Sequence, residues 1–188
     1  MDFIRDLVNK KAEIDKIDLS YLLPKMHRHN AQYLNLPPGQ EPYKLYKYIT
    51  YNMHGYIITE FGVLFGASLV VWASNRDNHV VAYDIEDQRT DACKDLYNTA
   101  FYRMSATDAI AQHPMIKGSK LIYVDTIHNG VEELATLNAL RNIGYHGITI
   151  WDDINLNDEM KSFFSSVKEE KIDLSAVGHW SGTGIIIL

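Results

Sequence analysis

The segment "LIYVDTIHNGVEELATLNALRNIGYHGITIWDD", residues 121–153, decides the fold class. An apolar run rich in β-branched residues at 121–125 is followed by a segment with helical character at 130–142 and by a second apolar run at 147–151. Two such runs joined by a helix are typical of parallel strands that lie side by side in one sheet. Each run also leads into acidic residues, so the segment predicts carboxylates at one edge of that sheet.

The same alternation continues on both sides of this segment. Further apolar runs lie at 56–60, at 80–84, more weakly at 100–104, and in the closing GIIIL at 184–188. Segments with helical character separate them at 66–74, 88–98, 106–113 and 157–169. We therefore predict an α/β fold, in which helices cover both faces of a doubly wound, mostly parallel sheet.

The N-terminal part has a different pattern. Residues 1–34 read as helical with mixed charge, and a second helix is predicted after a break at Pro37-Pro38-Gly39. We find no internal repeat, low-complexity segment or linker, so we expect one domain over residues 1–188. Within it we assign residues 1–54 to an N-terminal helical extension and residues 55–188 to the core.

The composition is that of a soluble globular protein, with 46% hydrophobic and 22% charged residues. The formal net charge of −6 argues against nucleic acid as the main partner, because a phosphate backbone is bound by a basic face. Cys93 is the single cysteine, which favours a reducing compartment. The N-terminal MDFIRDLVNKKAEIDK lacks the apolar core of a signal peptide, and no apolar run approaches the roughly 20 residues that span a bilayer. We expect a cytoplasmic protein that does not enter the membrane.

Acidic residues end four of the predicted strands. They are Glu60, Asp84, Asp125 and the pair Asp152-Asp153. Any one of them could cap the next helix or point into solvent. Parallel strands, however, place all these ends at one edge, where ligands of such sheets bind. Because clustered carboxylates repel one another unless a cation or a hydroxyl-rich ligand offsets the charge, we predict a ligand site there.

The first strand-to-helix turn indicates the kind of ligand. Gly62 and Gly66 flank it, and a turn without side chains lets a ligand approach the backbone. The spacing G-x-x-x-G differs from the G-x-G-x-x-G of dinucleotide-binding turns, which disfavours an NAD-type enzyme. Asp84, about twenty residues further on, is placed to accept both hydroxyls of a ribose. These residues predict a nucleoside-containing cofactor.

Asp125, Asp152 and Asp153 suggest a metal site. Three hard oxygen ligands completed by water suit Mg²⁺ or Mn²⁺. His128 follows Asp125 closely enough to act as a general base near such an ion. The alternatives remain open: His128 could be a helix-start residue bonded to backbone, and the paired aspartates could cap the segment INLNDEM.

The C-terminal "GHWSGTG", residues 178–184, leads into the last strand. His179 and Trp180 lie either at the rim of the substrate site or in a tight turn before an edge strand.

Together these motifs resemble class I S-adenosylmethionine-dependent methyltransferases from about Gln40 to the C-terminus. The motifs are E-x-G-x-x-x-G-x-S at 60–68, D-x-x-H at 125–128 and the double acid at 152–153. An E-x-Y-K-L helix before the first strand and the GHWSGTG tail are similar to small methyltransferase-like proteins. The D-x-x-H motif and the double acid are similar to metal-dependent sugar O-methyltransferases. The resemblance implies a Rossmann-like sheet of seven strands with an antiparallel C-terminal strand.

The resemblance also implies roles for individual residues. Glu60 and Gly62 would line the methionine and ribose part of the cofactor, Asp84 would accept from the ribose, and the turn from Ser105 to Asp108 would lie by the adenine. The full cofactor-binding set that it implies is Glu60, Gly62, Gly66, Ser68, Asp84, Ser105, Ala106, Asp108 and Asp125. Leu64 stands where such loops usually carry a second glycine, and Asn129 where similar proteins often carry an acid.

We therefore expect an S-adenosylmethionine-dependent O-methyltransferase that acts on a small hydroxylated acceptor, similar to a sugar or glycoside, with Mg²⁺ or Mn²⁺ as an assisting ion. Its substrate lid would come from the N-terminal helices or from another subunit of a homo-oligomer. The alternative from a different class is a non-catalytic nucleotide- or cofactor-binding module that serves as a partner-binding domain. An NAD-type oxidoreductase is the less favoured third reading.

Overall fold

A sheet of seven strands forms the centre of the computed structural model, which describes residues 2–26 and 34–188. In chain order the strands are β1 (Ile57–Phe61), β2 (His79–Asp84), β3 (Thr99–Arg103), β4 (Leu121–Val124), β5 (Ile148–Asp152), β6 (Glu170–Asp173) and β7 (Thr183–Ile187). The longer helices are α4 (Pro37–Tyr51), α5 (Ala67–Trp72), α7 (Ala106–Gln112), α8 (Val131–Asn142) and α9 (Asp158–Ser166). Short helical turns are α1 (Asp2–Arg5), η1 (Leu7–Lys10), α2 (Lys11–Ile14), η2 (Leu23–Lys25), α6 (Asp91–Lys94) and η3 (Pro114–Gly118).

The strand order across the sheet is β3-β2-β1-β4-β5-β7-β6. Neighbouring strands from β3 to β5 in this order pair in parallel, whereas β7 is antiparallel to both β5 and β6. This topology confirms the predicted doubly wound, mostly parallel sheet with an antiparallel C-terminal strand. The direction of winding reverses between β1 and β4, and ligands of such sheets bind beyond the carboxyl ends of the strands at this point.

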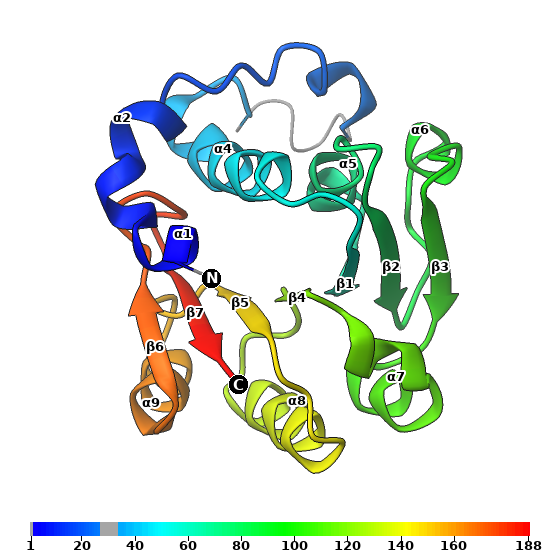
Figure 1. Ribbon diagram of the computed structural model, residues 1–188, viewed down its shortest axis with the longest axis vertical. Helices are drawn as coiled ribbons and strands as arrows, with labels where there is room; N and C mark the ends of the chain where they lie inside the picture. Colours follow the sequence, from blue (N-terminus) through cyan, green and yellow to red (C-terminus); the bar gives the residue numbers. More distant parts are fainter. Residues whose placement is uncertain (1, 27–33) are drawn as a thin grey trace.

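Helices cover both faces of the sheet (Figure 1). Leu121 and Tyr123 of β4 belong to the core on the face of α4, α5 and the N-terminal turns. Ile122 and Val124 belong to the core on the face of α7, α8 and α9. This alternation buries every residue of β4, as expected for a central parallel strand. None of the helices in the described ranges has both the length and the apolar character needed to cross a bilayer.

The N-terminal part differs from the helical segment predicted over residues 1–34. Its described residues form four short helical turns, and residues 27–33 of the prediction lie outside the described part. The next helix, α4, begins at Pro37 rather than after the predicted break. Proline at the first positions of a helix lacks only an N–H that would have no partner there, so Pro37-Pro38 starts the helix instead of preceding it.

Two further elements differ from the prediction. The helix expected at 88–98 is reduced to α6, which ends at Lys94. β6 was not among the apolar runs, because its sequence Glu-Lys-Ile-Asp contains one apolar residue, and its burial pattern is mostly exposed. An edge strand takes its backbone hydrogen bonds from one neighbour and leaves its other side to solvent, so hydrophobic patterning does not reveal it.

Candidate active site

Three loops at the carboxyl edge of the sheet have an unusual backbone. Leu64, His128 and Asp153 have φ angles of 47°, 59° and 58°, and they are the non-glycine residues with positive φ in the described part of the chain. They follow β1, β4 and β5, respectively. Such a conformation costs roughly 1–3 kcal/mol per residue and clusters at functional sites. The backbone therefore marks the same edge as the acidic residues.

A cavity of about 440 Å³, termed the larger cavity below, opens between the loops that follow β1, β2, β3 and β4. Its lining residues are Gly62, Leu64, Tyr83, Asp84, Ile85, Met104, Ser105, Ala106, Asp125, Thr126, Ile127, His128 and Glu132. The predicted cofactor-binding residues among them are Gly62, Asp84, Ser105, Ala106 and Asp125. The remaining predicted residues, which are Glu60, Gly66, Ser68 and Asp108, are not part of this lining.

Asp84 anchors the loop that follows β1. Its Oδ2 accepts hydrogen bonds from the backbone N–H groups of Val63 and Leu64 at 2.7 and 2.8 Å. Its Oδ1 accepts from the Glu86 N–H at 3.2 Å. The Asp84 carboxylate thus holds Leu64 in its left-handed conformation and also lines the cavity. A ribose bound there would donate to a carboxylate that already accepts hydrogen bonds from the loop. The N-cap of the next helix, α6, is Thr90 rather than Asp84.

The two glycines of the β1–α5 turn are required for different reasons. At Gly62 (φ 84°) a Cβ would overlap the carbonyl oxygen of Asp125, so glycine lets the β1 and β4 loops touch at the cavity. At Gly66 (φ 91°) a Cβ would lie 2.6 Å from the Sγ of the buried Cys93. The close approach predicted for a ligand at Gly66 is therefore made by Cys93.

Glu60 and Ser68 form a buried pair behind this turn. The Ser68 hydroxyl donates to Oε1 of Glu60, whose side chain is fully buried. Oε2 of Glu60 has no hydrogen-bond partner in the described chain. Burial raises the pKa of the Glu60 carboxyl to about 8, and the nearby charges of Asp125 and Asp84 act in the same direction. The pair thus contributes an unsatisfied oxygen close to two cavity carboxylates.

Ser105 and Asp108 cap α7. The Asp108 N–H donates to Ser105 Oγ at 3.2 Å, and the Ser105 hydroxyl donates to Asp108 Oδ2 at 2.6 Å. This reciprocal contact fixes the first turn of α7, so that Ser105 and Ala106 face the larger cavity. Asp108 acts on Ser105 and stays outside the lining.

Two polar side chains hold the loop between β4 and α8. The buried Glu133 accepts hydrogen bonds from Thr126 Oγ1 at 2.8 Å, the His128 N–H at 3.0 Å and the Gly130 N–H at 2.7 Å. Asn157, the N-cap of α9, donates through Nδ2 to the His128 carbonyl at 2.8 Å. Sequence reasoning missed both residues. An acid in the first turn of a predicted helix and an asparagine before the acidic start of the next one are capping signals that could have revealed them.

Asp125, Asp152 and Asp153 converge because β4 and β5 are parallel neighbours. The Tyr123 hydroxyl lies 3.1 Å from one oxygen of Asp125 and 3.1 Å from one oxygen of Asp152. The Tyr46 hydroxyl, from α4, lies 3.3 Å from the other oxygen of Asp152. Burial raises the pKa of Asp152, and the charges of the other two acids raise it further. The tyrosines were also missed, although strand alternation places Tyr123 on the same side as Asp125.

His179 and Ser181 contact Asp153 from the segment before β7. His179 Nδ1 lies 2.8 Å from Asp153 Oδ1, and the Ser181 hydroxyl contacts both atoms. Burial raises the pKa of Asp153, but hydrogen bonds from these two residues outweigh it and hold the pKa below its usual value. In a Ser-His-Asp triad the serine and the aspartate contact different ring nitrogens, so these three side chains do not form such a triad. Asn157 is the N-cap of α9, so the predicted alternative of an aspartate cap is wrong.

The His128 side chain lies between two acids. Its Nε2 is 3.2 Å from Asp125 Oδ1 and 3.7 Å from Asp153 Oδ2. Neither is aligned as a hydrogen bond, and Nε2 has no other partner among the described residues. Burial lowers the pKa of His128, but the contact with Asp125 and the charges of Asp153 and Asp152 outweigh it and raise the pKa to about 9. His128 therefore places Nε2 between the two acids, in an ion pair with Asp125 when the ring is protonated.

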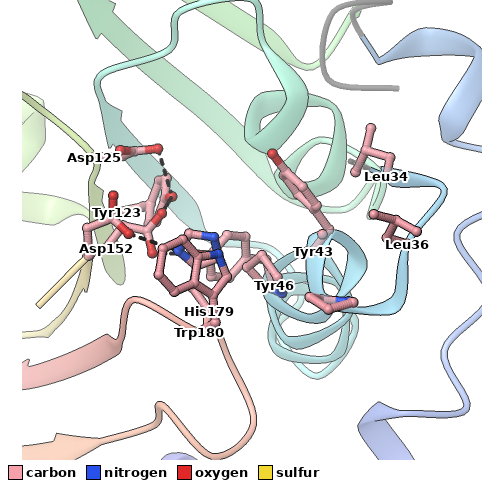
Figure 2. A pocket seen from close by; sticks show the side chains of 13 residues that line it. Leu34, Leu36, Tyr43, Tyr46, Tyr123, Asp125, Asp152, His179 and Trp180 are labelled. Atoms are coloured by element: carbon pink, nitrogen blue, oxygen red, sulfur yellow. Dashed lines mark hydrogen bonds and ion pairs between the residues drawn. The ribbon is translucent and has the colours of Figure 1, made fainter. Parts of the chain in front are cut away.

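A second cavity, of about 340 Å³ and termed the smaller cavity below, also borders Asp125. Its lining residues are Leu34, Leu36, Pro38, Gly39, Pro42, Tyr43, Tyr46, Tyr123, Asp125, Asp152, Asp153, His179 and Trp180. Figure 2 shows α4 facing the ends of β4 and β5, with His179 and Trp180 between them. These two residues, predicted for a substrate rim, thus lie at a cavity that meets the larger one at Asp125.

Comparisons with known proteins were made on sequence and on structure. No protein-family model and no curated protein matches the sequence. Methyltransferase PaMTH1 from Podospora anserina, solved with bound S-adenosylhomocysteine (SAH), has a TM-score of 0.59 and 14% identity, over 89% of this chain and 92% of that one. Fibrillarin from Aeropyrum pernix, with natively bound S-adenosylmethionine, has a TM-score of 0.52 and 10% identity, over 72% and 67%.

Cofactor-bound Rv0187 from MTB is a third match, with a TM-score of 0.55 and 13% identity over 96% of this chain and 87% of that one. The chain has the fold of the class I S-adenosylmethionine-dependent methyltransferases. The predicted resemblance to this superfamily is confirmed at the level of the fold.

The larger cavity suits the cofactor of this methyltransferase fold. Asp84 and Asp125 place carboxylates in its lining at the ends of β2 and β4, and the fully buried Glu60 lies behind this lining with one oxygen that lacks a partner. Leu64 adopts the left-handed conformation at the position where similar loops carry glycine, so the backbone path is kept without that residue. The residues present therefore fit a nucleoside whose ribose hydroxyls donate to a carboxylate at the end of β2.

The acidic cluster suits a divalent cation. One oxygen each of Asp152 and Asp153 and one ring nitrogen of His179 lie within 4.8 Å of one another. The predicted set was Asp125, Asp152 and Asp153, so the geometry brings His179 into the group and leaves Asp125 attached through Tyr123. Burial raises the pKa of Asp152 and the charges of Asp125 and Asp153 raise it further, and a cation bound there would lower it. Carboxylate oxygens with one imidazole suit Mn²⁺, and the oxygens alone suit Mg²⁺.

Proposed function

We propose that the protein transfers the methyl group of S-adenosylmethionine to a hydroxyl of a small acceptor, with a divalent cation at the acidic cluster. One observation carries the proposal. The larger cavity has the carboxylates that a nucleoside cofactor needs, the smaller cavity is separate, and both are lined by Asp125. A donor and an acceptor bound in the two cavities would meet at this residue, beside His128.

The chemistry is an in-line displacement. The acceptor oxygen forms a bond to the methyl carbon as the carbon–sulfur bond breaks, so the sulfonium becomes a neutral thioether and the hydroxyl proton must leave. Holding two reactants in line contributes several kcal/mol to such a reaction, which is the role that we assign to the two cavities. A cation on Asp152 and Asp153 would supply a lower pKa for an acceptor hydroxyl.

We assign to His128 the role of accepting the proton that leaves the acceptor hydroxyl. Its Nε2 lies 3.2 Å from Asp125 Oδ1 without an aligned hydrogen bond, and contacts to Glu133 and Asn157 fix its backbone, so the ring has a defined position beside Asp125. With the neighbouring carboxylates uncompensated, its pKa of about 9 keeps the ring protonated at neutral pH. The pKa falls when positive charge arrives beside Asp125, which is the direction that a general base needs.

Calorimetric titration with S-adenosylmethionine, S-adenosylhomocysteine and NAD tests the cofactor. We expect heat of binding with both sulfur compounds and none with NAD. Folded protein that gives no heat with either sulfur compound would overturn the proposal. Transfer of labelled methyl groups to a panel of alcohols, phenols and glycosides tests the reaction itself. Binding of the cofactor without turnover on the whole panel would instead favour a non-catalytic cofactor-binding module.

A further inference from the structure

The smaller cavity has two chemically different ends. At one end, Asp152, Asp153 and His179 come from the edge of the sheet and the segment before β7. The hydroxyl of Tyr123 lies at the same end, within 3.1 Å of Asp152. Figure 2 shows Asp152, His179 and Tyr123 close together, opposite the residues of α4. Polar atoms able to bind a hydroxyl are thus gathered at this end.

The opposite end is apolar. Leu34, Leu36 and Pro38 line it from the start of α4, together with Pro42 and the ring of Tyr43. Figure 2 shows Leu34 and Leu36 beyond Tyr43, on the side away from the aspartates. Among the described lining residues no lysine, arginine, asparagine or glutamine is present. Leu34 and Pro42 are buried, so a ligand hydroxyl held against them would meet carbon atoms and lose its hydrogen bonds to water.

We propose that the acceptor carries its hydroxyl at one end of an apolar, flat body, as a substituted phenol does, and that the cavity selects against sugars. The inference rests on the proposed function and replaces the sugar-like acceptor expected from the sequence. A sugar carries hydroxyls all around its ring, so those held against the buried Leu34 and Pro42 would lack partners. The ring of Trp180, 71% exposed and 5.5 Å from the His179 ring, offers a flat surface for the body at the rim.

Three ligands separate the two ends. 4-Ethylphenol has a hydroxyl at one end only, 4-(2-hydroxyethyl)phenol adds a second hydroxyl at the other end, and methyl α-glucoside carries hydroxyls all around. Each is titrated calorimetrically into the protein with saturating SAH and magnesium chloride, so no turnover is needed. We expect 4-ethylphenol to bind more tightly than 4-(2-hydroxyethyl)phenol by roughly tenfold, and the glucoside to bind more weakly still, because buried hydroxyls would lack partners.

A pair of variants tests the location. Leu36 is 57% exposed, so Leu36→Ser should fold, and serine is also a good N-cap at this position of α4. Leu36→Ser should weaken the binding of 4-ethylphenol and reduce the ratio of its affinity to that of 4-(2-hydroxyethyl)phenol to about threefold or less. The control is Leu134→Ser, since Leu134 is also exposed but lines neither cavity. It should leave the ranking unchanged.

The outcomes separate this inference from the proposed function. If SAH binds and the glucoside binds as tightly as 4-ethylphenol, or none of the three ligands binds, the acceptor class is wrong while the function stands. If SAH does not bind, the proposed function fails, and the same titrations on the protein alone still rank the ligands. A ranking that Leu36→Ser leaves unchanged would also overturn the inference.

Discussion

The two cavities that meet at Asp125 are built in different ways. The larger cavity is made from successive strand-to-helix turns of the core, which lie at 62–64, 84–85, 104–106 and 125–128. The smaller cavity joins residues 34–46 to residues 179–180, which are far apart in the sequence. The first kind of site leaves a repeated local pattern in the sequence, whereas the second exists only when distant segments fold onto one edge.

The cavities also differ in what fixes their walls. Around the larger cavity, carboxylates hold backbone N–H groups: Asp84 holds the β1 loop and Glu133 holds the β4 loop. Around the smaller cavity, the wall from the start of α4 consists of apolar side chains, and one tyrosine hydroxyl, that of Tyr46, reaches across to Asp152. The polar wall gives defined geometry, and the apolar wall gives a shape that an acceptor must match.

The largest effect is expected where the two cavities meet. His128→Ala should lower turnover by about 10²–10⁴-fold, the usual contribution of a general base, because it removes the ring nitrogen that lies beside Asp125. Affinity for SAH, measured by calorimetry, should stay close to that of the wild type. The exposed His146 provides the control, and His146→Ala should retain full turnover. A His128→Ala variant with more than about a tenth of wild-type turnover would contradict the assigned role.

The next effect separates the cavities. Asp84→Ala should weaken SAH binding by about 100-fold, because hydrogen bonds to a charged group contribute about 1.5–3 kcal/mol each and the β1 loop loses its anchor as well. Binding of 4-ethylphenol should change little, since Asp84 does not line the smaller cavity. Asp84→Asn keeps one oxygen for the loop and loses the charge, so its affinity for SAH should lie between those of the wild type and Asp84→Ala. Equal SAH affinity in all three proteins would show that Asp84 does not contact the cofactor.

A third prediction concerns the buried carboxyl behind the larger cavity. The pKa of Glu60 is raised from 4.5 to about 8, so the folded state binds its proton more tightly than the unfolded state does between these values. Stability from this group is therefore present at low pH and is lost as the pH rises toward 8. Glu60→Gln stays neutral at all these pH values. The stability of the variant relative to the wild type, followed by melting temperature, should therefore increase between pH 5 and pH 8 by about 3 kcal/mol. A difference that does not change with pH would mean that Glu60 is already ionised at pH 5.

The smallest effect concerns the acidic end of the smaller cavity. Millimolar Mg²⁺ or Mn²⁺ should raise the melting temperature by a few degrees, because a ligand at about ten times its Kd adds about 1.4 kcal/mol. Asp153→Asn should abolish this rise, since it removes one of the clustered oxygens. Asp158→Asn is the control, because Asp158 is an exposed acid at the start of α9. A melting temperature that neither ion changes would remove the cation from the proposal, and His128 would then act without a metal ion.

Much of the larger cavity was predictable from the sequence, because its residues follow strands directly. The strand boundaries were predicted within one residue for β4, and Asp84, Asp125 and Gly62 lie where the pattern placed them. The pattern did not predict which of these residues face the protein interior instead of the cavity. Gly66 packs against Cys93, and Glu60 is buried behind the turn. A strand end shows which way the chain leaves the sheet, but a carboxylate or glycine looks the same in sequence whether it faces a ligand or a neighbouring helix.

By itself the sequence determined the parallel sheet, the edge at which the acidic residues gather, and the pairing of Asp125 with Asp152, because each follows from hydrophobic periodicity and strand direction. The tertiary structure alone decided that His179 joins the acidic cluster, that Glu133 holds the loop of His128, and that α4 closes an apolar wall over the ends of β4 and β5. The physical reason is the distance in sequence between the residues that make contact. Periodicity records which face of one element is buried, whereas contacts between the start and the end of the chain depend on how complete elements pack.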